Sequence, residues 1–209
     1  MEFSSIQDFF CFINKNSEYV ILRNWDNIIN NISNGEDIDL LVEDKIKFIN
    51  LVNATPKYKD KLRSNYYVTI GNKKIRLDVR SFGDGYYPFF WEKLFLKNRV
   101  FNKDIDAYTL NGDDYYSALL YHSLIQKPDL KVKYLSVLCQ LSRKDMSFDQ
   151  LIEDLRTRLK QNNSYISLPE DHGVYINMEL IKDKELPYNF NSFDILVRTF
   201  RKILFKLFC

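Results

Sequence analysis

Apolar positions follow two different periods along this chain, and the change of period divides it near residues 102–112. In the first part, short apolar runs and apolar–polar alternation predict strands, since successive side chains of a strand point to opposite faces. These strands lie at 18–22, 37–42, 66–70 and 73–80. Helical spacing predicts helices at 4–15, 45–52 and 88–96.

After this division the strand signal fades and helical spacing dominates. The helices predicted there lie at 113–126, 130–141, 148–160 and 192–208. Ser147 and either Asn191 or Ser192 are the expected N-caps. We therefore predict an α+β protein, in which a mixed sheet flanked by helices is followed by a mostly helical C-terminal region. The predicted domains are residues 1–105 and 106–209.

Two glycine-containing segments punctuate the strand region. Gly71-Asn72 has the composition of a two-residue hairpin turn between the last two predicted strands. Gly83-Asp84-Gly85 follows the second of these strands and matches no phosphate-binding glycine pattern. This second segment is either an ordinary turn or, because of its position after an acidic strand, an acceptor-side loop.

Composition narrows the class of protein. The 209 residues are 45% hydrophobic with 6 Gly and 5 Pro, which indicates a folded core and excludes disorder. A net charge of +2 offers no clear nucleic-acid groove. The widely spaced Cys11, Cys139 and Cys209 form neither a disulfide framework nor a zinc site. We see no signal peptide and no apolar run long enough to span a membrane, so we expect a cytoplasmic protein.

The segment with the most chemical content is the strand that begins with Asp37 and Asp39. Residues two apart in a strand share a face, so these two carboxylates point the same way. Asp78 alternates with apolar residues in the 73–80 strand, and three carboxylates converge if the two strands are neighbours. Close carboxylates repel one another unless cations lie between them. Mg²⁺ prefers such oxygen ligands together with substrate phosphate, so the pattern predicts a metal site.

The same pattern also has a plainer interpretation. Asp-x-Asp alone is a weak signal, and Asp104-Ile105-Asp106 repeats it in a predicted loop or short strand. A solvated strand face also alternates acids with apolar residues. The presence of Asp78 on a second alternating strand favours the metal site over this interpretation.

The order of strand, turn, Asp-x-Asp strand, helix and third-acid strand resembles the nucleotidyltransferase superfamily. That superfamily includes DNA polymerase beta, the antibiotic nucleotidyltransferases and the minimal nucleotidyltransferases. The resemblance covers residues 5–82. In it, Asp37 and Asp39 match the metal-binding pair and Asp78 matches the third acid.

One position departs from the superfamily pattern. Arg23 and Asn24 stand where the family carries small residues that let backbone amides approach nucleotide phosphates. Their side chains would contact phosphate instead, Arg23 through its charged fork. In this respect the chain is similar to divergent members of the superfamily, including those that resemble the choline-phosphate transferases of bacterial surface polysaccharides. In these proteins the fold moves a phospho-alcohol group.

The resemblance implies a transferase that depends on Mg²⁺ or Mn²⁺. Asp37, Asp39 and Asp78 would be its metal ligands and catalytic residues, and Asp78 would be a ligand or the general base. A nucleoside triphosphate or CDP-alcohol would be the donor, and a small molecule or glycan the acceptor, with in-line attack at phosphorus. The alternative is a catalytically inactive binding protein or toxin–antitoxin-type protein of the same fold, which the Arg23-Asn24 turn supports.

Further candidate site residues lie outside the three aspartates, and each has two interpretations. The side chains of Tyr115, Tyr116, Tyr121 and His122 either contact a base or substrate or belong to the core. Arg76 and Arg80 share the predicted face of Asp78, and they either hold its carboxylate in place or bind the phosphate of the acceptor.

The last predicted helix is basic and amphipathic. Its apolar stripe contains Leu196, Phe200, Ile203, Leu204 and Leu207, whereas Arg198, Lys202 and Lys206 lie away from it. This stripe either closes a helical core or makes a peripheral contact with an anionic membrane or a lipid-linked substrate.

Overall fold

The structure is a computed structural model that describes residues 2–60 and 62–208, without the side chains of residues 205–208. The described chain divides into two compact units. One contains residues 2–84 and 92–111, and the other contains residues 85–91 and 112–208. The first unit carries the sheet and the second is helical, which confirms the α+β class. The boundary between the units in the sequence falls between residues 111 and 112, whereas the predicted boundary was between residues 105 and 106. Residues 85–91 also belong to the helical unit.

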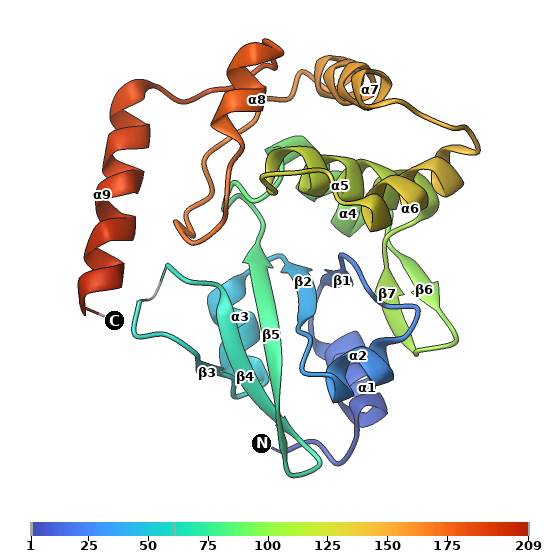
Figure 1. Ribbon diagram of the computed structural model, residues 1–209. Coiled ribbons are helices and arrows are strands. Elements are labelled where there is room, and N and C mark those ends of the chain that lie inside the picture. The colour runs from blue at the N-terminus through green and yellow to red at the C-terminus, as the bar shows by residue number, and fades with distance from the viewer. Residues whose placement is uncertain (1, 61, 209) are drawn as a thin grey trace. The chain divides into compact units, whose positions relative to one another are not determined.

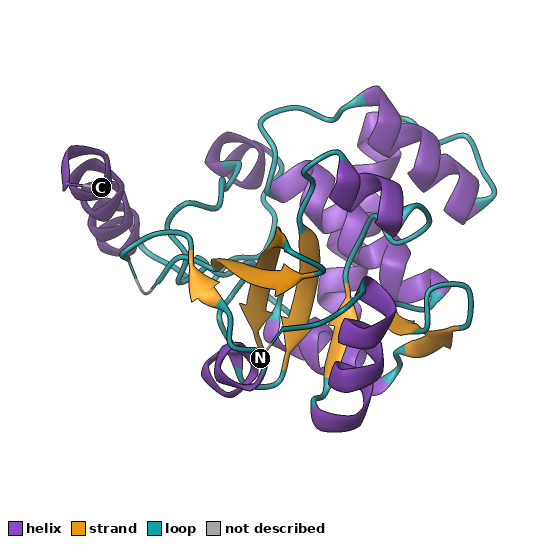
Figure 2. Cartoon of the chain, turned by 90° about the horizontal axis from the view of Figure 1, so that it is seen from below, coloured by secondary structure: helices purple, strands orange, loops and turns teal. Residues whose placement is uncertain are grey.

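Seven strands of the described chain form one sheet in the order β3-β4-β5-β2-β1-β7-β6 (Figure 1). Their bounds are β1 Tyr19–Ile21, β2 Ile38–Val42, β3 Thr55–Pro56, β4 Asn65–Ile70, β5 Lys73–Ser81, β6 Val100–Asn102 and β7 Ala107–Thr109. The β2–β5 and β1–β7 pairs are parallel and the other neighbours are antiparallel. The sheet is therefore mixed, as predicted, and its strands form a single group in Figure 2.

The central strands follow from their sequence pattern. Ile38, Leu40 and Val42 are all at most 2% exposed, so one face of β2 is core. The β4–β5 hairpin turns at Gly71-Asn72, with φ of 50° and 61°. Positive φ at both central residues is what a type I′ turn requires, and it matches the twist of the flanking strands. This hairpin supplies the strand that carries the third acid.

Four helices accompany these strands in the chain, namely α1 Ile6–Asn16, α2 Ile28–Ser33, α3 Lys45–Leu51 and α4 Phe89–Lys97. Ser5 caps α1 by accepting a hydrogen bond from the backbone N–H of Asp8 at 3.1 Å. Phe9 and Phe10 on that helix are buried in the core. In the view of Figure 1, α3 lies behind β4 and β5, and it packs against β5.

Strands β6 and β7 were missed in the sequence. Each has three residues, which is too short for alternation to show. Pairing stabilises them, because β7 lies parallel to β1 and the hydroxyl of Tyr19 accepts a hydrogen bond from the backbone N–H of Tyr108 at 3.3 Å. Asp104-Ile105-Asp106, the second Asp-x-Asp, lies in the turn that joins the two strands.

The second unit contains α5 Gly112–Ile125, α6 Val132–Ser142, α7 Phe148–Gln161, α8 Met178–Asp183 and α9 Ser192–Phe208. Helix α5 is buried on almost all sides after its first turn, so it forms the centre of this unit. Ser147 caps α7 in a capping box with Gln150, as expected for an N-cap at this position. Helix α8, six residues long, was not predicted because it is too short for helical periodicity to show.

The glycine segment after β5 is a constrained turn. Asp84 accepts a hydrogen bond from the backbone N–H of Ser81 at 3.0 Å, and Gly83 donates its own to Glu92 at 2.7 Å. Gly85 has a φ of 75°, and a Cβ there would lie 3.0 Å from the backbone oxygen of Leu168. Glycine is thus required at position 85 both by conformation and by close packing.

We predict that Gly85→Ala lowers the free energy of unfolding by more than 1 kcal/mol, about the cost of left-handed strain alone. Gly35→Ala is the matched control, because Gly35 has a φ of 78° but nothing within 4 Å of a Cβ. Urea unfolding of both variants should show the larger loss for Gly85→Ala. Equal losses would mean that the contact with Leu168 has no energetic weight.

Candidate metal centre

Three aspartates from two neighbouring strands converge in the first unit. β2 and β5 run parallel, and their register sets Asp39 directly beside Asp78. Asp37 lies one residue before β2 and two residues before Asp39. Each carboxylate offers one oxygen, and these oxygens all lie within 4.8 Å of one another. The convergence expected from the alternating pattern is therefore confirmed.

Burial sets this cluster apart from ordinary surface acids. Asp39 is 4% exposed and Asp78 is 8% exposed, whereas Asp37 is half-buried. Taking a carboxylate out of water costs several kcal/mol unless opposite charge and hydrogen bonds compensate it. The interpretation of these acids as a solvated strand face is therefore wrong for Asp39 and Asp78.

Arginines provide that compensation for the two buried acids. Arg23 donates from Nε to Asp39 Oδ2 at 3.1 Å and also from Nη2 to Asp39 Oδ1. Arg80 donates from Nη2 to Asp78 Oδ2 at 2.7 Å, and both of these side chains are buried. Such charge-assisted bonds are stronger than neutral ones and hold each carboxylate in a fixed orientation.

The half-buried acid has an arginine of its own. Arg76 donates from Nη2 to Asp37 Oδ1 at 3.2 Å, and the side chains of this pair are 33% and 29% exposed. The three aspartates and the three arginines therefore balance in formal charge. The expected partner, the carboxylate of Asp78, is therefore held by Arg80, whereas Arg76 holds that of Asp37 instead.

Asp78 is the least well compensated of the three acids. Burial raises its pKa to about 6, with Arg80 opposing the rise and the carboxylate of Asp39 adding to it. Arg80 engages only Oδ2, and Oδ1 of Asp78 is buried without a hydrogen-bond partner among the described residues. A cation at Oδ1 would supply the missing interaction.

The donor set fits a small divalent cation. Mg²⁺ binds oxygen at about 2.0–2.1 Å, so oxygens on opposite sides of one ion are about 4.2 Å apart. Oxygens on adjacent sides are about 2.9 Å apart, so the three oxygens, which lie within 4.8 Å of one another, would close in on an ion placed between them. Mn²⁺ accepts the same carboxylate ligands. Asp39 differs in one respect, because Arg23 engages both its oxygens and must release one of them for a metal.

Arg23 and Asn24 lie just after β1, with Leu22 between, and Arg23 contacts the cluster through Asp39. The backbone N–H of Leu22 donates to the carbonyl of Asp39 at 2.9 Å, which brings this segment next to the acids. Asn24 is exposed and has a φ of 59°, a conformation that favours glycine and that asparagine tolerates. A glycine-like backbone thus occurs where the nucleotidyltransferases carry small residues. The expected phosphate contact by Arg23 would require it to turn away from Asp39.

Three of the four candidates on helix α5 are core residues, whereas Tyr115 is half-buried. The hydroxyl of Tyr116 donates to an aspartate of α7 at 2.6 Å, and Tyr121 is fully buried. His122 Nδ1 lies 2.9 Å from Gln126 Oε1, and Gln126 donates in turn to the carbonyl of Tyr86 at 2.5 Å. Buried side chains with such bonds stabilise the helical unit, which favours the core interpretation for all three.

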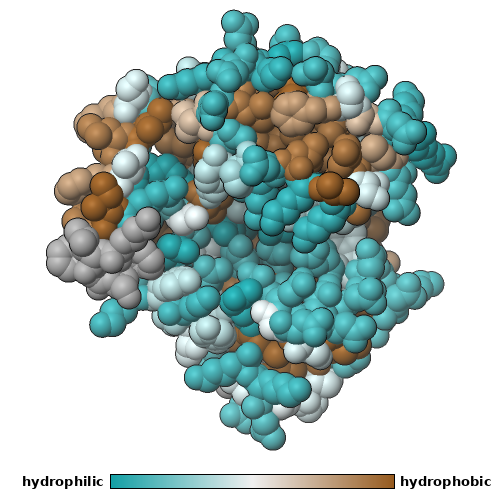
Figure 3. All heavy atoms as spheres, viewed as in Figure 1, coloured by the Kyte–Doolittle hydropathy of each residue, from teal (hydrophilic) through white to brown (hydrophobic). Residues whose placement is uncertain are grey.

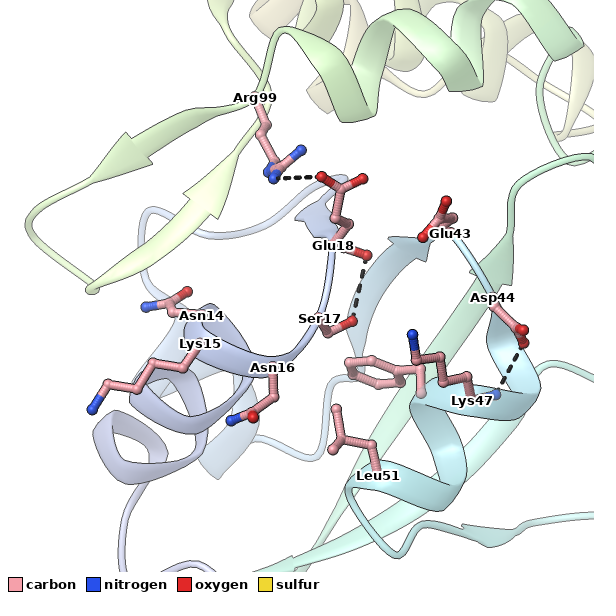
Figure 4. A pocket seen from close by; sticks show the side chains of 11 residues that line it. Asn14, Lys15, Asn16, Ser17, Glu18, Glu43, Asp44, Lys47, Leu51 and Arg99 are labelled. Atoms are coloured by element: carbon pink, nitrogen blue, oxygen red, sulfur yellow. Dashed lines mark hydrogen bonds and ion pairs between the residues drawn. The ribbon is translucent and has the colours of Figure 1, made fainter.

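A cavity of about 340 Å³ lies at the other end of β1 and β2 (Figure 4). Glu18 precedes β1 and Glu43 follows β2, whereas the aspartate cluster lies where β1 ends and β2 begins. Figure 4 shows Glu18 and Arg99 pointing toward each other, with an N–O distance of 3.4 Å. Acidic and basic side chains are equally frequent in the lining, so no net charge selects a ligand, and we assign the cavity no role.

No protein-family model, no curated protein and no solved structure matches this chain. The resemblance to nucleotidyltransferases therefore stays a prediction from the residues and strand order of the sequence. Among the described residues, no helix is both long enough and apolar enough to cross a bilayer.

Asp78 makes the stability of the protein depend on pH in a defined direction. Its pKa rises from 3.8 in the unfolded chain to about 6 in the native protein, so the native state binds the proton more tightly. Its contribution to the free energy of unfolding therefore falls as pH rises between these values. Asp78→Asn removes this titration.

We predict that the stability difference, wild type minus Asp78→Asn, declines as the pH rises from about 4 to about 6. Subtraction cancels the titration of carboxylates that do not interact with Asp78. Urea unfolding of the metal-free protein at a series of pH values measures this difference. A difference that is flat or that increases over this range would contradict the assignment.

Proposed function

We propose that the protein is a metal-dependent transferase of the nucleotidyltransferase type. It moves a nucleotidyl or phospho-alcohol group from a nucleoside triphosphate or CDP-alcohol to a small-molecule or glycan acceptor. The observation that carries this proposal is the register of β2 and β5, which sets Asp39 beside Asp78 with Asp37 close by. Three carboxylates that converge on adjacent strands are a costly arrangement unless positive charge lies beside them, which a bound cation would supply.

Each acid has a role that follows from its surroundings. Asp37 is half-buried and bound by one arginine, so it can exchange partners easily and hold a cation. Asp39 would be a second ligand of the cation if Arg23 released one of its oxygens. Asp78, with one unpartnered oxygen, completes the site as a ligand or accepts the proton of the attacking hydroxyl. A bound Mg²⁺ or Mn²⁺ would neutralise charge on the phosphate and its leaving group.

Arg23 is positioned to exchange one anion for another. Its planar guanidinium pairs with the Asp39 carboxylate through two nitrogens, and the same geometry suits two phosphate oxygens. A cation at Asp39 would displace Arg23 and leave it beside the donor phosphate. Asn24 is exposed next to it and offers an amide to the same phosphate. These side chains would take over the role that the superfamily gives to backbone amides.

The acceptor class follows from the charge of the chain. A net charge of +2 gives no extended basic surface for a nucleic acid, so a small molecule or a glycan is the favoured acceptor. The resemblance to choline-phosphate transferases suggests a step in the decoration of a surface polysaccharide.

One observation favours a second function. The three arginines already balance the three aspartates without a metal. A cluster that is neutral by itself suits a catalytically inactive protein of this fold, such as a binding protein or a toxin–antitoxin-type partner. Such a protein would gain no stability from a metal or a nucleotide and would copurify with a protein partner.

Thermal unfolding distinguishes the two functions. We expect one of the four nucleoside triphosphates or a CDP-alcohol to raise Tm by several degrees, and only with Mg²⁺ or Mn²⁺ present. Asp37→Asn and Asp39→Asn should abolish this shift and lower turnover of that donor by about a hundredfold or more.

Asp104→Asn provides the matched control, because this exposed acid belongs to the other Asp-x-Asp and lies outside the cluster. It should behave like the wild type. The inactive function would be favoured if no donor or metal changed Tm. A shift of equal size in Asp39→Asn would place the binding site elsewhere.

Arg23 competes with the metal for Asp39. We therefore predict that Arg23→Ala increases Mn²⁺ affinity by at least about tenfold, since it removes a buried cation from the edge of the site. Titration calorimetry measures the affinity. Arg99→Ala, which removes an ion pair at the other end of β1, should leave it unchanged. Unchanged or weaker Mn²⁺ binding by Arg23→Ala would show that the arginine does not occupy the metal position.

A further inference from the structure

Helix α9 presents its apolar stripe on the exposed side. In Figure 3, apolar side chains gather over this helix at the left edge of the molecule. The interpretation in which this stripe closes a helical core is therefore wrong for Leu196, Phe200, Ile203 and Leu204. The side chain of Leu207 lies outside the described part of the chain. The exposed fractions are 69% for Phe193, 64% for Leu196, 60% for Phe200, 50% for Ile203 and 38% for Leu204.

A polar side chain attaches the opposite side of α9 to its unit. Arg198 donates from Nη2 to the carbonyls of Asp171 at 3.1 Å and Val174 at 2.7 Å, and from Nη1 to that of Pro169. Arg198 is half-buried, whereas the apolar positions are exposed. A surface helix of a globular protein ordinarily has the reverse arrangement, with its apolar stripe facing the core. Contiguous exposed apolar surface of this kind marks an interaction site.

The charges around the stripe identify the partner. Helix α9 contains Arg198, Arg201, Lys202 and Lys206 but Asp194 as its only acid. At about 100° per residue, Arg201 flanks the stripe on one side and position 206 flanks it on the other, whereas the half-buried Lys202 lies near Arg198 on the side toward the protein. Basic residues beside an apolar face suit a helix that lies in the surface of an anionic bilayer. Their long side chains reach the headgroups while the apolar residues enter the acyl region.

A second helix is a poorer fit for the same face. The stripe positions are spaced alternately three and four apart, as in a coiled-coil seam. However, α9 has 17 residues, about two heptads, and a recognisable coiled coil needs about three to four. In that seam of positions 193, 196, 200, 203 and 207, the flanking positions hold a single charge and so form no complementary pattern that would select a partner helix, namely Ser192, Val197, Thr199, Leu204 and Lys206.

We propose that α9 is a peripheral membrane anchor, which lies on an anionic lipid surface with its stripe inserted. The helix need not cross the bilayer, and the anchor does not depend on the metal centre. Such an anchor would hold the protein at the surface where lipid-linked molecules are found.

Flotation with vesicles tests this anchor. The full chain should bind vesicles of phosphatidylglycerol and phosphatidylcholine, bind pure phosphatidylcholine at least about tenfold more weakly, and dissociate at high salt. The double variants Leu196→Gln/Phe200→Gln and Arg201→Glu/Lys206→Glu should each lower binding to anionic vesicles by at least about tenfold.

The control for the apolar variant is Val132→Gln/Phe148→Gln, which replaces exposed apolar residues of α6 and α7 in the same unit. It should bind vesicles like the wild type. A Phe200→Trp variant should also show a blue-shifted emission with anionic vesicles, since Trp25 and Trp91 are buried at 8% and 2% exposure.

Three results would overturn the proposal. The first is a full chain that does not bind anionic vesicles, and the second is binding that the α9 variants do not change. The third is a stable dimer, seen by sedimentation, that Leu196→Gln/Phe200→Gln dissociates without any vesicle binding by the wild type, because the stripe would then be a protein interface.

Discussion

The repulsion between three carboxylates on adjacent strands is the constraint on which the rest of this structure depends. Parallel pairing of β2 and β5 sets Asp39 beside Asp78, and their burial makes the repulsion strong because little water screens it. Two solutions are available to such a cluster. One is the set of arginine pairs seen in the structure, and the other is a divalent cation. The arginines and a divalent cation neutralise the same charges, so they exclude each other in part. They compete most directly at Asp39, because Arg23 binds both of its oxygens.

This competition connects the fold with the proposed chemistry. A site that is neutral by itself can fold and stay intact without its cation, since no aspartate is left without a counter-charge. The unpartnered Oδ1 of Asp78 and its raised pKa show where the arginine pairs are insufficient. A cation together with a phosphate-bearing donor would satisfy the acids and leave the arginines free to contact the phosphate. The same residues would then serve as structural ion pairs before binding and as a substrate site afterwards.

Much of the sheet could be predicted from the sequence, and the reasons are physical. Alternation located β2, β4 and β5 within a residue or two, because one face of each is core, and Gly71-Asn72 fixed the hairpin. The convergence of Asp37, Asp39 and Asp78 followed once two strands were taken as neighbours.

The short strands β6 and β7 could not be predicted, because pairing with β1 stabilises them and three residues show no period. The pairing of Arg23 with Asp39 was also missed, since it depends on the antiparallel register of β1 and β2, which a single sequence does not specify. For α9 the stripe was recognised, but its exposed orientation depends on tertiary packing through Arg198.

The aspartate cluster is proposed to be a cation site in which Arg23 occupies Asp39 until the cation binds. A crystal structure of the protein soaked with Mn²⁺ and a nucleotide or CDP-alcohol, recorded with anomalous scattering, tests it most directly. If the cluster binds a cation, an anomalous peak should lie between Asp37, Asp39 and Asp78, with the guanidinium of Arg23 turned from Asp39 toward a phosphate. Intact arginine pairs with no anomalous density at the three carboxylates would contradict it.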